Sequence, residues 1–272
     1  MLRSTRRDCE IDGRSGTMAV RSTTTSQMTS LLGIDCATQP ERVGLSLGEL
    51  RDGVVRITQC RTATRREAPA EIAAAWLRDC DRALIALDAP LGWPHALGAC
   101  LRVHRAGQGM QVQANDLFRR STDIDIRHRL GKRPLEVGAN LVSRTAVAAL
   151  ELLGAIRNRT GLAIPLAWGW EESEPLCAIE VYPAATRLAR GAPDVGGSLV
   201  GLEQGLDWSL VAPPSLRSVH ARDAAVCALA GADFLLGRAV PPCDGEVARI
   251  EAWIWAAQLR SMPSDGTRSR SR

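Results

Sequence analysis

The feature that most limits the fold of this chain is a short apolar run over residues 83–87 that ends at Asp88. Five consecutive apolar residues are typical of a strand that is buried on both faces of a sheet. The segment before it, residues 68–80, carries apolar residues at helical spacing with Pro69 near its start, where proline is favoured in a helix. A helix followed by a buried strand indicates an α/β protein in which helices are layered on a sheet.

The rest of the chain continues this alternation of strands and helices. An Arg51-Asp52-Gly53 turn signal indicates a hairpin between the second and third strands. A weakly patterned insert spans about residues 92–135. The predicted strands are 31–35, 43–50, 54–60, 83–87 and 176–183, the predicted helices are 68–80, 141–156, 184–190 and 221–236, and 250–259 fits a helix or a strand equally well.

We expect one domain over residues 30–260, because no second core is visible in the sequence. Residues 1–29 and 261–272 lack hydrophobic periodicity and are predicted to be disordered tails. Residues 1–30 and 261–272 together hold eight of the 34 basic and four of the 30 acidic side chains. The 26 of each kind that remain cancel, so the net charge of +4 gives no evidence for a polyanionic partner.

The cysteines and the hydropathy narrow the class of protein. None of the eight cysteines forms a CxxC pair, which argues against a zinc ribbon or a thioredoxin-type site. No apolar run reaches the roughly 18 residues of a membrane span, and no secretory signal is visible. We therefore expect a cytoplasmic protein with reduced thiols and no membrane partner.

Four acidic residues are singled out by their positions. Asp35 and Asp88 each follow an apolar strand, Glu180 lies at the end of another, and Asp223 opens a helix. Ionised carboxylates in such places are costly unless they are paired or bound to a metal. Ligands of open α/β sheets collect at the carboxyl ends of strands, so these acids would converge if their strands are neighbours. Alternatively, each acid is a turn former or a helix cap.

Several segments resemble a known family. They are Gly33-Ile34-Asp35, Leu87-Asp88-Ala89-Pro90-Leu91-Gly92-Trp93-Pro94, Arg119-Arg120-Ser121-Thr122-Asp123, Ile179-Glu180-Val181-Tyr182-Pro183-Ala184-Ala185 and Asp223-Ala224-Ala225-Val226-Cys227-Ala228-Leu229. These are similar to the signature segments of the domain-of-unknown-function 429 family, whose members are predicted nucleases with a ribonuclease H-like fold. The resemblance covers about residues 31–257. It implies a mixed five-stranded sheet of order 3-2-1-4-5, flanked by helices.

The same resemblance implies that Asp35, Asp88, Glu180 and Asp223 hold Mg²⁺ or Mn²⁺, hard cations that prefer oxygen ligands. We expect a nuclease that hydrolyses phosphodiester bonds of DNA or RNA with two such ions, bridged by Asp35. Two alternatives stay open. A phosphotransferase of the sugar-kinase and actin type has a related sheet, although Ala37 stands where its phosphate loop needs glycine. A non-catalytic binding protein would keep the fold and use the acids structurally.

The insert carries the one local excess of charge in the core. Residues 92–135 contain eight basic and three acidic side chains. We expect Arg119 and Arg120 to be surface residues that hold substrate phosphates beside the metals. Asp123 either joins the site or pairs with a neighbouring arginine. The alternative for the whole insert is a solvated helix and loop with internal ion pairs.

Overall fold

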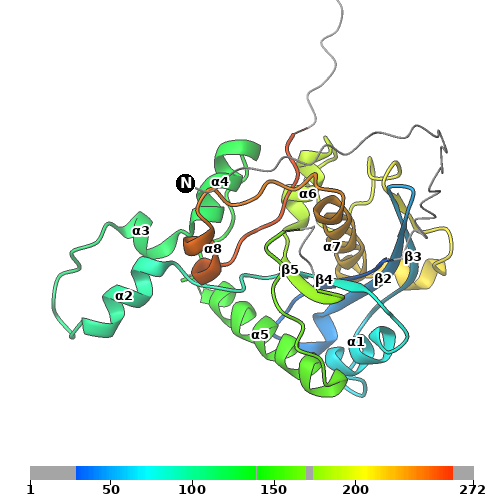
Figure 1. Ribbon diagram of the computed structural model, residues 1–272, viewed down its shortest axis with the longest axis horizontal. Coiled ribbons are helices and arrows are strands. Elements are labelled where there is room, and N and C mark those ends of the chain that lie inside the picture. The colour runs from blue at the N-terminus through cyan, green and yellow to red at the C-terminus, as the bar shows by residue number, and fades with distance from the viewer. Residues whose placement is uncertain (1–28, 139, 170–173, 260–272) are drawn as a thin grey trace, which may run out of the picture.

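A computed structural model describes residues 29–138, 140–169 and 174–259 of the chain (Figure 1). The two predicted disordered tails lie outside this range, apart from Thr29. The strands are β1 (Thr29–Asp35), β2 (Gly44–Arg51), β3 (Val54–Thr62), β4 (Ala83–Asp88), β5 (Leu176–Glu180) and β6 (Leu206–Asp207). The helices are α1 (Pro69–Leu77), α2 (His95–Val103), α3 (Ala114–Phe118), α4 (Ser121–Leu130), α5 (Asn140–Thr160), α6 (Pro183–Ala189), α7 (Val219–Leu235) and α8 (Gly245–Glu251), with 3-10 turns at Pro40–Arg42 and Pro213–Arg217.

The strands form one mixed sheet of order β5-β4-β1-β2-β3-β6. β1, β2 and β3 are antiparallel, whereas β4 and β5 run parallel to β1. The predicted ribonuclease H-like order 3-2-1-4-5 is therefore confirmed. The structure adds β6, a two-residue strand parallel to β3 that is too short to produce a periodic signal in the sequence. The predicted hairpin is also present, with positive φ angles at Asp52 and Gly53 in its turn.

Helices cover both faces of the sheet, as the buried strand requires (Figure 1). Alternate residues of β4 point to opposite faces. Leu84 and Ala86 pack with α7 on one face, and Ile85 and Leu87 pack with α1 and α5 on the other. We refer to these as the α7 face and the α5 face.

Two glycines allow α7 to approach the sheet closely. A Cβ atom at Gly33 of β1 would lie 1.9 Å from the carbonyl oxygen of Ala224, and one at Gly44 of β2 would lie 2.0 Å from that of His220. Both distances are far below a van der Waals contact, so no other residue fits without moving the helix. The glycines thereby set the first turn of α7 directly over the end of β1.

The insert and the C-terminal segment meet beside the sheet. α2 and α3 project away from the sheet, whereas α4 lies against α6 and α8 (Figure 1). The segment 250–259, which the sequence left open, is mostly neither helix nor strand. α8 ends at Glu251, Ala252 takes a positive φ of 62°, and Ile254 forms an isolated bridge with Glu180. Among the described helices, none combines the length and apolarity that a membrane crossing needs.

Candidate active site

Asp35 and Asp88 end the adjacent strands β1 and β4 and are paired with each other in the parallel register. Residues paired in this way lie on neighbouring strands about 4.8 Å apart and point to the same face. Asp88 has the same parity as Leu84 and Ala86, so both acids point to the α7 face. The predicted adjacency of these two residues is therefore observed in the structure.

The two carboxylates are in an environment that disfavours their charge. Burial raises the pKa of Asp88 well above its ordinary range, and the charges of Asp35, Asp223 and Glu180 raise it further. The charge of Arg187 acts in the opposite direction. Burial likewise raises the pKa of Asp35 to about 6, against the opposing effect of a hydrogen bond and charge from His220. No described residue donates a hydrogen bond to the Asp88 carboxylate. Asp88 is thus a partly buried acid that forms no hydrogen bond or ion pair with a described residue, and the cation near it, Arg187, is paired with Asp223.

The first turn of α7 supplies two further side chains to this edge. The Nδ1 atom of His220 lies 2.6 Å from Oδ2 of Asp35. Asp223, three residues later on the same helix face, forms an ion pair with Arg187 and accepts a hydrogen bond from the backbone N–H of Gly197 at 2.9 Å. Asp35, Asp88 and Asp223 therefore form a group of three acids, of which two have partners. We call these three residues the acid group.

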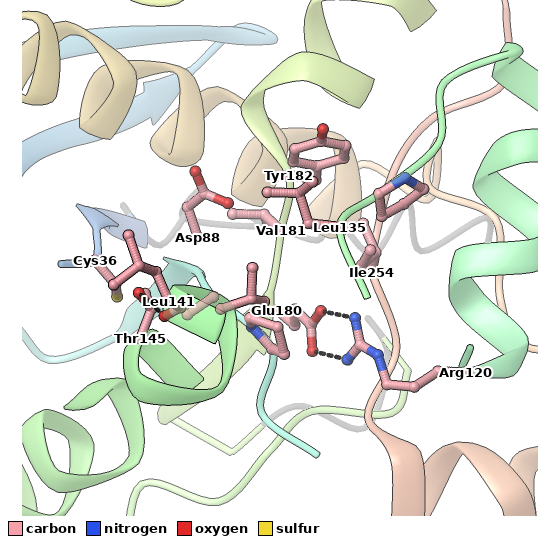
Figure 2. Close-up of a pocket in the computed structure, with 14 residues that line it drawn as sticks. Cys36, Asp88, Arg120, Leu135, Leu141, Thr145, Glu180, Val181, Tyr182 and Ile254 are labelled. Atoms are coloured by element: carbon pink, nitrogen blue, oxygen red, sulfur yellow. Dashed lines mark hydrogen bonds and ion pairs between the residues drawn. The ribbon is translucent and has the colours of Figure 1, made fainter. Parts of the chain in front are cut away.

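Glu180 does not join the acid group, contrary to the expectation that four carboxylates converge. It is paired in register with Leu87, not with Asp88, and therefore points to the α5 face. Arg120 donates to both of its carboxylate oxygens at 2.8 Å, and the backbone N–H of Leu91 donates at 2.9 Å. Figure 2 shows the Asp88 and Glu180 carboxylates directed away from each other. Both oxygens of Glu180 are occupied, so it is not available as a metal ligand in this arrangement.

Arg120 and Asp123 belong to the same buried assembly. The Arg120 side chain is 1% exposed and also forms an ion pair with Asp123 at 3.0 Å. Its Nη1 donates to the carbonyl oxygen of Glu251 at 3.1 Å. The expectation that Arg120 is a surface ligand for phosphate is therefore wrong, because its donors are directed into the protein. The residues Arg120, Glu180 and Asp123, which we call the arginine clasp, join the insert to the end of β5.

Arg119, the neighbouring predicted phosphate ligand, is placed differently. Its Nε donates to Glu136 at 3.1 Å, and its side chain is only 19% exposed. Other basic residues of the insert are also paired, Arg129 with Asp125 and Lys132 with Asp194. The internal ion pairs that the sequence allowed as an alternative are thus present in much of the insert. Arg127 is exposed and has no ion-pair partner among the described residues.

A cavity of about 320 Å³ lies between the acid group and the arginine clasp (Figure 2). Asp88 borders it on one side, and the Glu180–Arg120 pair borders it on another. The remaining walls are mainly apolar. They come from the loop after β4, the end of the insert, the first turns of α5 and the segments that follow β5 and α8, and include Pro90, Leu135, Leu141, Val142, Tyr182 and Ile254.

His220 and Arg187 are site residues that the sequence interpretation missed. His220 precedes Asp223 by three positions in a helix, a spacing that places both on one face and that would have indicated it. Arg187 follows the strand that ends at Glu180 by seven residues and has no comparable local signal. Its partner Asp223 is 36 positions away, so only the packing of α6 against α7 brings the two together.

The acid group fits a divalent cation in its chemistry. Carboxylate oxygens are the ligands that Mg²⁺ and Mn²⁺ prefer, and no described residue donates a hydrogen bond to Asp88 that would compete with a cation. Only these acids suit a cation, because both carboxylate oxygens of Glu180 accept hydrogen bonds from Arg120. Across the described residues, no three His, Cys, Asp or Glu side chains are already gathered closely enough to bind a metal ion. Binding of a cation would therefore require the side chains of Asp35 and Asp88 to move closer together.

The sheet order and the acids at its carboxyl edge define a ribonuclease H-like α/β protein. Residues 33–198 match the model of a family described as "Protein of unknown function (DUF429)". The match spans more than half of the chain, which therefore belongs to this family, as its signature segments indicated. No curated protein sequence is similar enough to count as a match.

One solved structure that this chain matches is T. thermophilus RuvC in complex with Holliday junction substrate. The similarity covers 79% of this chain and 99% of that chain, with 13% sequence identity and a TM-score of 0.36. A likeness at this level assigns neither an activity nor a substrate to the present chain.

Proposed function

We propose that this protein is a divalent-metal-dependent nuclease whose metal is held by Asp35 and Asp88, with Asp223 beside them. The observation that carries the proposal is the Asp88 carboxylate, which is partly buried beside other acids and receives no hydrogen bond from a described residue. The nearby cation, Arg187, is already paired with Asp223. Such an arrangement destabilises a protein unless a cation neutralises it. Acids of this kind collect at functional sites, where the loss of stability is offset by activity.

The acids and their partners have separate roles in this proposal. Asp35 and Asp88 bind Mg²⁺ or Mn²⁺, which when bound lowers the pKa of water and neutralises charge on a phosphodiester. Arg187 holds Asp223 through their ion pair and so directs this third acid. The glycines at positions 33 and 44 keep α7, and with it Asp223, close to the strand ends.

His220 is placed to handle a proton at this edge. Its side chain is 40% exposed, so solvent reaches it, while Nδ1 lies at Asp35. When Nδ1 carries the hydrogen and donates it to Asp35, Nε2 is free to accept a proton from water. No described residue bonds to Nε2. His220 therefore orients Asp35 and provides a proton acceptor beside the acid group.

Calorimetric titration with MgCl₂ and MnCl₂ tests the metal site directly. We expect saturable binding to the parent protein and its loss in Asp35→Asn and in Asp88→Asn. Asp207→Asn is the matched control. Asp207 is a surface acid that is paired with Arg56, and it does not lie at the carboxyl ends of β1 and β4. Binding that is equally strong in Asp88→Asn and the parent would contradict the proposed metal site.

The reaction is tested with the same variants on labelled single-stranded and double-stranded DNA and RNA. We expect cleavage that needs the divalent cation, is abolished by a chelator, and falls by at least about a hundredfold in Asp88→Asn. Losses of this size are typical when an electrostatic stabiliser of the transition state is removed. Metal binding without cleavage of any of the four substrates would overturn the nuclease assignment and leave the metal site intact.

A further inference from the structure

The cavity beside Asp88 is a feature that the metal chemistry does not explain. The acid group faces α7, whereas the cavity opens between Asp88 and the arginine clasp, and most of its lining is apolar. We propose that this cavity takes one unstacked nucleobase, so that the protein acts on single-stranded or locally unpaired nucleic acid. The inference rests on the proposed nuclease function and names the class of its substrate.

The size and the mouth of the cavity fit a single ring system. Small-molecule sites begin at roughly 300 Å³, so a cavity of 320 Å³ has room for one base. Leu135 and Leu141 line the mouth with 71% and 65% of their surfaces exposed. Large apolar side chains that stay exposed at the rim of a concave site indicate a ligand with an apolar surface.

The polar groups that line the cavity determine which hydrogen-bonding groups a ligand can present to it. Thr145 donates its hydroxyl hydrogen to the carbonyl oxygen of Leu141 at 3.0 Å, so its oxygen faces other groups as an acceptor. Arg120, the cation in the wall, is already saturated by Glu180 and Asp123. Arg120 therefore has no donor left for a phosphate, and a ring with an N–H group that can donate a hydrogen bond to Thr145 is favoured.

The position of the cavity links the base to the reaction. Asp88 belongs both to the acid group and to the cavity wall. A nucleotide whose base enters the cavity therefore has its sugar and phosphate beside the proposed metal. Inside a duplex the base is stacked and paired, and extracting it costs a few kcal/mol. Single strands, gaps and mismatches avoid this cost, which makes them the preferred substrates.

Binding of the nucleosides adenosine and cytidine, measured by NMR titration in chelator-treated buffer, tests the cavity without metal or phosphate. Leu141→Trp fills the mouth from an exposed helical position, and Leu150→Trp is the matched control on the same helix, outside the cavity lining. We expect adenosine affinity to fall about tenfold or more in Leu141→Trp and to stay unchanged in Leu150→Trp. Equal affinity in both variants, or binding of ribose 5-phosphate instead of adenosine, would overturn the proposal.

Cleavage assays separate this inference from the nuclease proposal. We expect the parent to cut a single strand at least about tenfold faster than the same sequence in a duplex, and Leu141→Trp to remove this preference. An abasic nucleotide at the cleaved position should reduce the parent rate in the same way. Equal cutting of both forms, unaffected by Leu141→Trp, would refute the base site and keep the nuclease. Adenosine binding that Leu141→Trp removes, without cleavage of any substrate, would keep the base site and refute the nuclease.

Discussion

Asp88 and Glu180 end neighbouring parallel strands, yet their surroundings are opposite. Glu180 is 3% exposed and receives three hydrogen bonds, two of them from a guanidinium. Asp88 is also largely enclosed, but it receives no hydrogen bond from a described residue, and the charges of neighbouring acids raise its pKa more than the charge of Arg187 lowers it. The same element of sequence, an acid after an apolar strand, is thus held by an ion pair in β5, and in β4 it is the residue that we propose as a metal ligand.

The difference arises from which face of the sheet each acid occupies. On the α5 face the insert returns to the sheet, and Arg120 at the start of α4 reaches Glu180 from 60 positions away. On the α7 face the first turn of α7 brings Asp223 and His220, so the acids there face a third acid and a titratable ring. A buried acid that a cation neutralises adds rigidity, whereas one left beside like charges favours a metal ion.

The largest expected effect comes from removing the cation of the arginine clasp. Arg120→Met keeps much of the volume of the side chain but leaves Glu180 and Asp123 buried without their partner. Breaking a buried ion pair from one side destabilises a protein by about 3–5 kcal/mol. We expect a loss of at least this size in the free energy of unfolding, measured by urea denaturation.

Arg119→Ala is the matched control for this experiment. Arg119 is the adjacent residue, and its pair with Glu136 lies closer to the surface. Pairs of this kind contribute about 0–1 kcal/mol. If Arg120→Met and Arg119→Ala reduce the free energy of unfolding by the same small amount, the arginine clasp does not stabilise the fold. The contrast between Glu180 and Asp88 then disappears.

Neutralising the two acids one at a time should change stability in opposite directions. Glu180→Gln replaces an acceptor with an amide that faces the donors of Arg120, and we expect a loss of about 3 kcal/mol or more. Asp88→Asn removes a carboxylate that receives no hydrogen bond and lies beside other acids, so we expect the metal-free protein to gain about 0.5–2 kcal/mol. Thermal denaturation in the presence of a chelator measures both changes. A loss of stability in Asp88→Asn would show that the Asp88 charge is compensated in the folded protein.

The pH dependence of stability should distinguish the acid group from the rest of the protein. The pKa of Asp35 is raised to about 6 from an ordinary value of 3.8, so between these values the folded state binds more protons than the unfolded state. Stability from this group is therefore fully present below about pH 4 and is lost as the pH rises to about 6. The loss amounts to about 3 kcal/mol at most, and Mg²⁺ should reduce it.

Other groups titrate in the same range. The measured quantity is therefore the difference in the free energy of unfolding between the parent and Asp35→Asn across pH 4–7. The difference should change with pH in chelator and become smaller in saturating MgCl₂. A difference that is constant with pH would mean that Asp35 titrates normally in the folded protein.

The strand order and the Asp35–Asp88 pair could be predicted from the sequence because both depend on local patterns. An apolar run that ends in an acid marks the carboxyl end of a strand, and the family segments gave the order of the strands. The face of Glu180 could not be predicted, since β5 is apolar on both faces up to its last residue. Without alternation along the strand, only its register with β4 decides where the last side chain points.

The burial of Arg120 could not be predicted from the sequence either. Arg119 and Arg120 are identical neighbours in the sequence, and a charged pair in a polar insert indicates a surface. The one local signal was Asp123, whose carboxylate accepts a hydrogen bond from the backbone N–H of Arg120 at 3.0 Å and so caps α4. The partner that buries the guanidinium, Glu180, lies far along the chain and is reached only when the insert folds back onto the sheet.

The smallest expected effect concerns the part of the insert that remains at the surface. If its free basic groups contact phosphates, Arg127→Ala should weaken polynucleotide binding in the absence of cleavage, measured with the Asp88→Asn background. Each phosphate contact contributes about 0.7–0.9 to the slope of log K against log salt, so this variant should flatten the slope by about that amount. Arg119→Ala should flatten it less, because Glu136 already neutralises Arg119. Equal slopes in the parent and Arg127→Ala would mean that nucleic acid does not cross α4, and that the insert serves the protein only through the arginine clasp.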